Sequence, residues 1–154
     1  MTVASSTRTI VLLRHAKAEH VYDKSDHDRD LTPRGRRDAQ EAGRWLHDAG
    51  FVADLALCSS SERTRQTWDE ACFGGAGATR TAYEPLIYSG GTGRVLQRLR
   101  ELDDDVDRVI VVGHAPVMPD LTSLLSSGEG SLEAHDALGE GFPTSGLAML
   151  DFSG

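Results

Sequence analysis

Long apolar runs and clustered cysteines are both missing from this sequence of 154 residues. No stretch approaches the roughly 20 apolar residues that cross a bilayer. Residues 1–8 are polar, unlike a signal peptide, so we expect a loose tail there and no membrane association. The two cysteines, Cys58 and Cys72, form neither a CxxC pair nor a disulfide framework. We therefore expect a cytoplasmic protein with reduced thiols.

Positive charge is also in short supply. Lys and Arg total 16 against 24 Asp and Glu, which gives a formal net charge of -8. A field of that sign repels the phosphate backbone, so we do not expect binding to nucleic acid. An enzyme acting on phosphate esters would have to gather its arginines locally. The few cations do form clusters, at residues 34–37 and 63–65.

Signatures of nucleotide chemistry and of serine hydrolysis are absent. There is no Gly-x-x-x-x-Gly-Lys-Ser/Thr loop for nucleotide phosphates and no Gly-x-Gly-x-x-Gly fingerprint for dinucleotides. The serine run at residues 59–61 lacks a Gly-x-Ser-x-Gly elbow, so we interpret it as a helix cap rather than as a source of nucleophiles. We expect no nucleotide or other cofactor.

What the sequence does contain is an alternation of apolar strands and amphipathic helices. Residues 9–13 and 108–113 are almost continuously apolar, which is typical of parallel strands covered on both faces. Thr32 and Pro33 predict the start of a helix that Gly50 ends. This order predicts an α/β fold, a three-layer α/β/α sandwich with a mostly parallel central sheet, as one domain over residues 1–154. Further strands are expected at 55–58, 82–87 and 146–152, helices through 63–71, 95–102 and 116–126, and loops at 17–29 and 128–141.

Two histidines directly follow strands of this predicted sheet. His15, preceded by Arg14, follows the first strand, and His114 follows a later one. Both should lie beyond the carboxyl edge, where open α/β sheets bind ligands. Arg63 falls in the first turn of a helix, whose N-terminus favours anions. A histidine nucleophile needs guanidinium groups that hold the phosphoryl oxygens, so this pattern predicts phosphoryl transfer.

Three motifs make the sequence resemble a known family. They are Leu-Leu-Arg-His-Ala at 12–16, Cys-Ser-Ser-Ser-Glu-Arg-Thr-Arg-Gln-Thr at 58–67 and Val-Val-Gly-His-Ala-Pro at 111–116. In this order they resemble the histidine phosphatase superfamily (branch 1, phosphoglycerate mutase-like). Within it, the short chain and the Arg-His-Ala-Lys form are most similar to the SixA-type phosphohistidine phosphatases.

The resemblance implies a metal-independent hydrolase that acts without a cofactor. His15 would take a phosphoryl group from phosphohistidine in a protein, or from a related phosphomonoester, and water would hydrolyse the covalent phosphohistidine. Arg14, His15, Arg63 and His114 would bind the phosphoryl group. The implied partner is a phosphorylated protein or a small phosphorylated substrate, and we expect the enzyme to be a monomer.

Two positions matter for how far the resemblance extends. Ala16 stands where the family commonly has glycine, and its methyl group is acceptable if the backbone there keeps a negative φ. Larger relatives use a glutamate after the third strand as general acid, and the corresponding candidate here is Glu84, ahead of Pro85. Without a working acid the substrate needs a good leaving group, such as the imidazole of a phosphohistidine.

Two other functions fit the same motifs. One is a small-metabolite phosphatase or mutase of the superfamily, which would need a general acid and further basic contacts. The other is a non-catalytic phosphoprotein-binding module. A metal site in the Asp-rich loop is less consistent with the sequence, because no ligand pair there is fixed on a helix or strand; its residues would be His20, Asp23, Asp26 and His27. The loops at 17–29 and 128–143 should set specificity.

Overall fold

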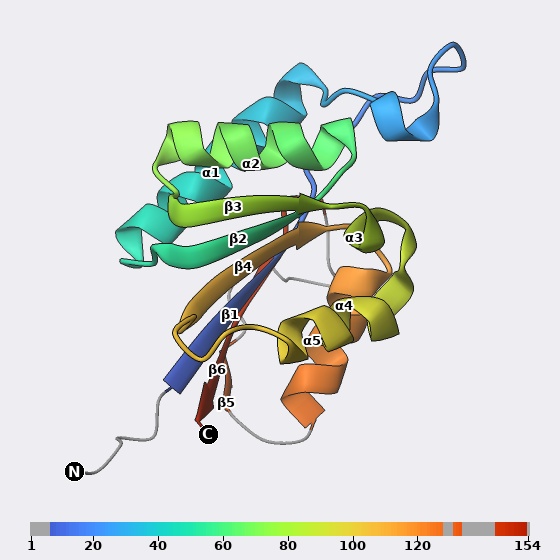
Figure 1. The fold of residues 1–154 in the computed structure, drawn as a ribbon. Coiled ribbons are helices and arrows are strands. Elements are labelled where there is room, and N and C mark those ends of the chain that lie inside the picture. The colour runs from blue at the N-terminus through green and yellow to red at the C-terminus, as the bar shows by residue number, and fades with distance from the viewer. Residues whose placement is uncertain (1–6, 128–130, 134–143, 154) are drawn as a thin grey trace, which may run out of the picture.

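Six strands form one sheet with helices on both faces in the part of the chain that this computed structural model describes, residues 7–127, 131–133 and 144–153 (Figure 1). The strand order is β3-β2-β4-β1-β6-β5. The strands are β1 (Thr7–Arg14), β2 (Ala53–Ser59), β3 (Ala78–Glu84), β4 (Arg108–Gly113), β5 (Ser131–Glu133) and β6 (Leu147–Ser153). The helices are the short 3-10 helix η1 (Asp26–Asp28), α1 (Pro33–Asp48), α2 (Glu62–Gly74), α3 (Pro85–Ser89), α4 (Gly91–Arg100) and α5 (Val117–Ser127).

The first four strands run parallel to one another. β4 pairs with both β1 and β2, and β2 pairs with β3. Only the last part of the sheet is antiparallel, where β6 pairs with β1 and with β5. The predicted α/β sandwich with a mostly parallel sheet is therefore confirmed. The carboxyl ends of β1, β2 and β4 reach the same edge, at Arg14, Ser59 and Gly113.

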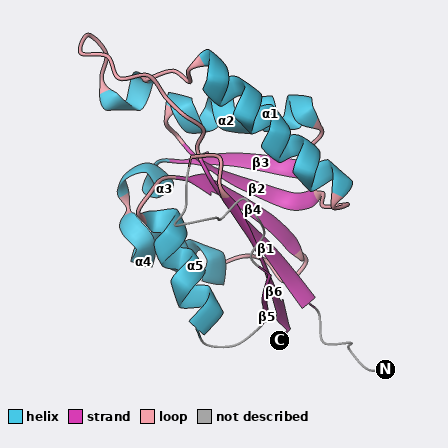
Figure 2. Ribbon diagram, turned by 180° about the vertical axis from the view of Figure 1, so that it is seen from behind, coloured by secondary structure: helices cyan, strands magenta, loops and turns pink. Residues whose placement is uncertain are grey.

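Each face of the sheet has its own apolar core, and Figure 2 shows the helix layer that covers each one. On one face, Val11 and Val112 pack with Leu46 of α1 and Trp68 of α2. On the other face, side chains of β1, β2 and β4 pack against α3, α4 and α5, among them Leu12, Leu57, Val111, Ile87, Val95 and Leu121. Successive side chains of a strand point to opposite faces, so strands covered on both sides are apolar throughout.

The helix α1 begins and packs as its sequence predicts. Thr32 caps it by accepting a hydrogen bond from the backbone N–H of Gly35, and Pro33 takes the first helical position. Gly43 lies so close to α2 that a Cβ atom there would overlap the backbone carbonyl of Ala71. This close approach fixes the position of α2, which carries Arg63 in its first turn.

The largest difference from the sequence-based expectation lies around residues 82–87. We expected one extended segment, whereas β3 begins at Ala78 and α3 begins at Pro85. The strand is polar and exposed at residues 79–81, as an edge strand can be, so it lacks an apolar signal. Pro85 has the fixed φ of a first helical residue, and Glu84 before it is extended.

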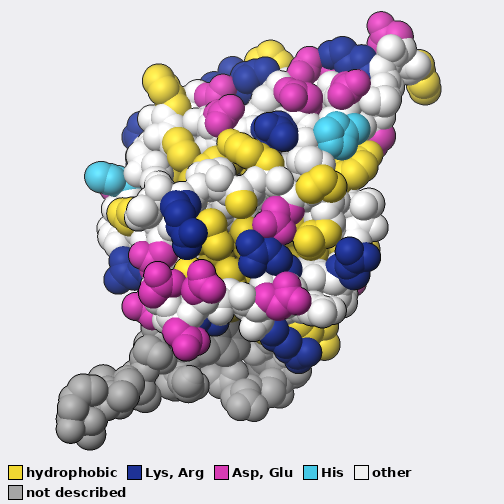
Figure 3. All heavy atoms as spheres, viewed as in Figure 1, with side chains coloured by type: hydrophobic (Ala, Val, Ile, Leu, Met, Phe, Trp, Pro, Cys, Tyr) yellow, Lys and Arg dark blue, Asp and Glu magenta, His cyan; other side chains and the backbone are white. Residues whose placement is uncertain are grey.

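Smaller differences concern the ends of elements. β1 begins at Thr7, which pairs with Ser153, so the expected tail does not include Thr7 and Arg8; residues 1–6 lie outside the described residues. The strand β5 lies within the loop expected at 128–141, and the rest of that loop, residues 128–130 and 134–141, lies outside the described residues. On the face shown in Figure 3, acidic and basic side chains are intermixed. None of the helices in the described ranges is long and apolar enough to span a membrane.

Candidate active site

His15 lies at the carboxyl edge of the sheet, directly after β1. Its backbone N–H donates to the carbonyl oxygen of Gly113 at the end of β4, at 2.9 Å. The residue is 9% exposed, and its Nδ1 lies 2.7 Å from the carbonyl oxygen of Ala16. Because a carbonyl oxygen only accepts, Nδ1 carries the ring proton and Nε2 keeps its lone pair. The ring therefore has the free nitrogen that a nucleophile needs.

Ala16 is fully buried beneath this histidine. Its backbone N–H donates to Oγ1 of Thr67 at 2.9 Å, and Thr67 in turn donates to the carbonyl oxygen of Arg63 at 2.7 Å. In the described part of the chain, Ser145 is the one non-glycine residue with a positive φ, so Ala16 has the negative φ that its side chain requires. The alanine is thus compatible with the local backbone, as expected, and its hydrogen bond ties the segment that carries His15 to α2.

His114 faces His15 across the same edge of the sheet. The two ring centroids are 5.4 Å apart, and His114 is also 9% exposed. Its Nε2 lies 2.7 Å from Oγ of Ser59 at the end of β2. Its Nδ1 is buried and has no hydrogen-bond partner among the described residues. If Ser59 donates to Nε2, the proton resides on Nδ1, which can then donate to a bound oxygen.

Arg63 is held by its neighbours in the first turn of α2. Its Nη1 donates to the backbone carbonyl oxygen of Asp26 at 2.7 Å, and its Nη2 donates to Oδ2 of the same residue at 3.0 Å. The residue is 6% exposed, and its Nε is buried without a hydrogen-bond partner in the described residues. A buried guanidinium group with an unused N–H is suited to an anionic ligand.

A cavity of about 450 Å³ brings the predicted site together. It is lined by the four residues that were predicted to bind the phosphoryl group, Arg14, His15, Arg63 and His114. Four further side chains with donor groups line the same cavity, namely Lys17, His20, Arg29 and Thr144. The arginine and lysine side chains thus gather positive charge at one place in a chain whose net charge is -8.

Both site histidines are neutral at neutral pH. The pKa of His15 is lowered to about 4, first by burial and then by the charges of Arg63 and Arg14, while the bond to the Ala16 carbonyl acts in the opposite direction. The pKa of His114 is lowered to about 3, again mainly by burial. A neutral His15 keeps its Nε2 lone pair available for attack on phosphorus.

We expect these two histidines to make the protein less stable as the pH falls from about 6.5 toward 4. An unfolded histidine binds a proton near pH 6.5. The folded pKa values of His15 and His114 are lowered to about 4 and about 3, so the unfolded state binds more protons in this window. Urea unfolding at a series of pH values measures the effect. The double variant His15→Asn, His114→Asn should show a smaller slope, and an unchanged slope would contradict the explanation.

Glu84, the predicted general acid, is not brought to this cavity. It ends β3, at the same edge of the sheet, but its two carboxylate oxygens accept hydrogen bonds from Nε of Arg98 in α4, at 3.0 and 3.1 Å. It does not line the cavity that contains His15. The resemblance to larger relatives had suggested this role for Glu84, within an extended segment expected at 82–87, whereas β3 ends at Glu84. The structure therefore does not support Glu84 as the general acid.

The Asp-rich loop before α1 has partners other than a metal ion. Asp26 binds Arg63, and Nε2 of His27 lies 3.0 Å from Oγ of Ser60. Within the described ranges, no group of three or more His, Cys, Asp or Glu side chains is arranged to hold a metal ion. The loop thus contributes to the site by contacting an arginine.

Three residues that contact the site were not assigned to it from the sequence. Ser59 bonds His114, although we interpreted the serine run as a cap; the residue that caps α2 is Ser61. Asp26 bonds Arg63, and Tyr88 of α3 donates to Oδ2 of Asp26 at 2.7 Å. The one signal for Ser59 was its position at the end of a buried strand. Asp26 and Tyr88 lie in segments without periodicity, so no pattern related them to Arg63.

Comparison with known proteins defines the family of this chain. Residues 10–81 match the family model of the histidine phosphatase superfamily (branch 1). An uncharacterized protein of Mycobacterium tuberculosis (strain H37Rv) is 37% identical over 144 residues, which cover 92% of this chain and 88% of the relative. The chain belongs to the histidine phosphatase superfamily.

Solved structures narrow the similarity within that superfamily. A proposed phosphohistidine phosphatase SixA from Nakamurella multipartitia is 34% identical, with a TM-score of 0.75, over 96% of this chain and 86% of that one. A second proposed SixA, from Agrobacterium tumefaciens, is 31% identical, with a TM-score of 0.79, over 94% of this chain and 91% of that one. The fold is thus phosphoglycerate mutase-like and the chain is SixA-like, which supports a phosphatase activity.

Proposed function

We propose that this protein removes phosphoryl groups from phosphohistidine in proteins, through a covalent intermediate on His15. The observation that carries the proposal is the state of the His15 ring, whose Nδ1–H is bound to the Ala16 carbonyl while Nε2 is free. The ring lies in one cavity with Arg14, Arg63 and His114. The similarity to proposed SixA proteins supports the choice of phosphohistidine as substrate.

In the first step, Nε2 of His15 attacks phosphorus. The bond between phosphorus and the substrate nitrogen breaks, and its electron pair leaves with the substrate imidazole, which departs neutral when its other nitrogen carries a proton. Arg14 and Arg63 stabilise the charge on the three equatorial oxygens. The His15 ring gains positive charge as the new bond forms, and its Nδ1–H already points at the Ala16 carbonyl oxygen.

In the second step, water attacks the phosphoryl group and the bond from phosphorus to Nε2 breaks. The electron pair returns to Nε2, and the proton lost by the water passes to a phosphate oxygen or to solvent. Nδ1 of His114, when protonated, donates to a phosphoryl oxygen in both steps. Inorganic phosphate leaves, and the neutral His15 ring is restored.

The leaving group decides which substrates react. Glu84 is engaged by Arg98, and the carboxylate that contacts the site, Asp26, has its pKa lowered to about 2, chiefly by the Tyr88 hydrogen bond, so it remains ionised and does not donate a proton. General acid catalysis is worth typically about 10²- to 10⁴-fold. Substrates that need no proton donated to the departing atom are therefore favoured, and phosphohistidine that carries a proton on its other ring nitrogen is such a substrate.

Hydrolysis rates on matched substrates, with excess chelator present throughout, test this function. We expect kcat/KM for a phosphohistidine-bearing protein to exceed that for a phosphoserine-bearing protein or phosphoglycerate by about 10²-fold or more. We also expect chelator to leave the rate unchanged, because the proposed steps use only side chains of the chain itself.

The other outcomes distinguish the remaining functions. Faster turnover of phosphoglycerate than of phosphohistidine would identify a metabolite phosphatase or mutase. Binding of phosphate without hydrolysis of any substrate would identify a phosphoprotein-binding module. Loss of activity on addition of chelator would contradict the metal-independent mechanism.

A further inference from the structure

A carboxylate is already bonded to the guanidinium group that should bind phosphate. Asp26 accepts from Nη2 of Arg63 with Oδ2 and from Nη1 with its backbone carbonyl oxygen, at 3.0 and 2.7 Å. The Arg63 side chain is 8% exposed, so it has little access to water that could replace these contacts. A phosphoryl group that enters the cavity must therefore share this arginine with a second anion.

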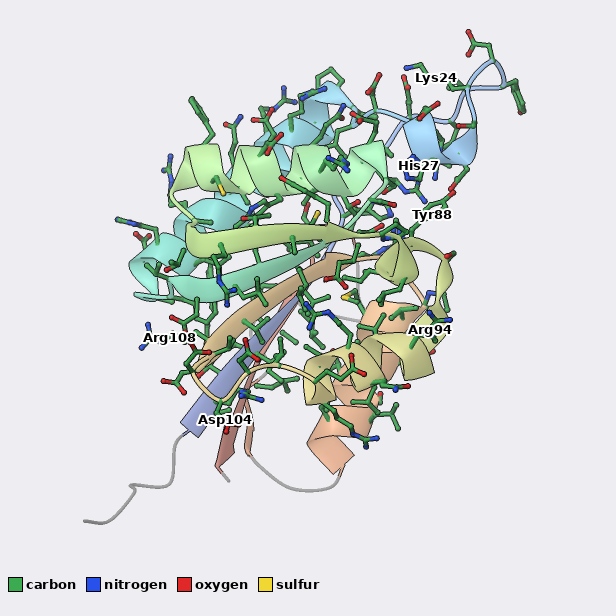
Figure 4. All side chains as sticks on the ribbon, viewed as in Figure 1. Lys24, His27, Tyr88, Arg94, Asp104 and Arg108 are labelled. Carbon is green, nitrogen blue, oxygen red and sulfur yellow. The ribbon has the colours of Figure 1, made fainter. Side chains whose placement is uncertain are left out.

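Several contacts hold Asp26 in this position. It lies in η1, on the segment that projects beyond α1 in Figure 1. Tyr88 donates to its Oδ2 at 2.7 Å, and Nε of Arg29 lies 3.2 Å from its Oδ1. The ring of His27 packs edge-on against Tyr88, with centroids 4.8 Å apart, and Figure 4 shows the two side chains next to each other. The carboxylate is thus held against Arg63 of α2 by Tyr88 of α3 and by Arg29.

The Asp26 carboxylate and a bound phosphate are both negatively charged and repel each other. Its carboxyl pKa is lowered to about 2, so it is ionised throughout the range in which the enzyme would work. Two anions bound to one guanidinium group repel each other, and the repulsion is moderated here because the Asp26 side chain is 56% exposed. Asp26 should therefore orient Arg63 and at the same time reduce its affinity for phosphate.

We propose that Asp26 is a positioning residue that fixes the Arg63 guanidinium and keeps the binding of inorganic phosphate weak. The inference rests on the proposed function, because it takes the anion of the cavity to be the phosphoryl group and the phosphate product. Binding that is equally strong in the ground state and in the transition state does not raise kcat, and a tightly held product slows turnover. A resident carboxylate limits such ground-state binding without removing the arginine.

Calorimetric titration with inorganic phosphate at low ionic strength tests the proposal. Asp26→Asn and Asp26→Ala should each bind phosphate about tenfold more tightly than the wild type. Asp28→Asn is the matched control, since it removes the same charge from the same turn. Its side chain is 65% exposed, and its Oδ1 lies 3.7 Å from Nδ1 of His27. We expect its phosphate affinity to stay within about twofold of the wild type.

Steady-state kinetics on para-nitrophenyl phosphate supply a second readout. In Asp26→Asn, KM and the inhibition constant for phosphate should fall by a similar factor, while kcat does not rise. A merely structural role would lower the melting temperature and would not tighten phosphate binding. Weaker or unchanged phosphate binding in both Asp26 variants would overturn the proposal. Calorimetry needs no turnover. A wild type that binds phosphate without hydrolysing it would refute the proposed function, and the phosphate affinities of the Asp26 variants would still test the role of Asp26.

Discussion

Replacement of His15 by Ala is expected to lower phosphate release by on the order of 10⁴-fold or more. The variant lacks the Nε2 that would attack phosphorus, and the other neutral imidazole in the cavity, that of His114, has its Nε2 engaged by Oγ of Ser59. The measurement is the rate on para-nitrophenyl phosphate, together with acid-labile, alkali-stable labelling of the protein by a radioactive phosphoryl donor.

A second histidine variant controls for the loss of an imidazole. His47 lies in the last turn of α1 and is exposed, away from the cavity lining. His47→Ala should keep both the rate and the covalent label. Turnover or labelling that persists in His15→Ala would identify a different nucleophile.

Replacement of Arg63 by Lys should lower kcat/KM by about 10²- to 10³-fold, although the charge is kept. Lysine lacks the planar guanidinium group that lets arginine donate to both oxygens of Asp26 and to a phosphoryl group at once. Its cation would therefore no longer be fixed relative to phosphorus. A misplacement of about 1 Å can alone cost about 10²-fold. The measurement is kcat/KM on the same substrate, with the melting temperature as a check on folding.

Arg65 offers a matched control for this change. It lies two residues further along α2, where its guanidinium group stacks 4.3 Å above the Tyr83 ring and Nε donates to the carbonyl oxygen of Ser60 at 2.9 Å. Arg65→Lys makes the same chemical change outside the cavity and should keep kcat/KM within about threefold. An equal loss in both variants would show that the effect comes from α2 as a whole.

The layers of the fold could be predicted because apolar runs and helical periodicity are local signals. The runs at 9–13 and 108–113 fall within β1 and β4, and Thr32 with Pro33 marks the start of α1. The edge strand β3 gave no such signal, since one side of it faces solvent and its polar residues resemble a loop. The sequence therefore predicted buried strands better than exposed ones.

The placement of residues in the candidate site was predictable where a residue ends or directly follows a buried strand. Arg14, His15 and His114 occupy such positions, and the shared edge of the sheet brings them together. Glu84 shows the limit of that argument, because the end of a strand gives the position of a residue and not the partner that its side chain finds. Asp26 shows another limit, since its contact with Arg63 spans 37 residues and depends on how the projecting segment folds back.

The fixed orientation of the His15 ring has a stereochemical consequence. Since Nδ1 is tied to the Ala16 carbonyl, Nε2 would approach phosphorus from one constant side in the proposed mechanism, and an in-line displacement there would invert the configuration at phosphorus. Water would then enter from the side that the leaving group has vacated and displace Nε2 with a second inversion. A phosphoryl group made chiral with sulfur and oxygen isotopes would thus leave this protein with its original configuration retained.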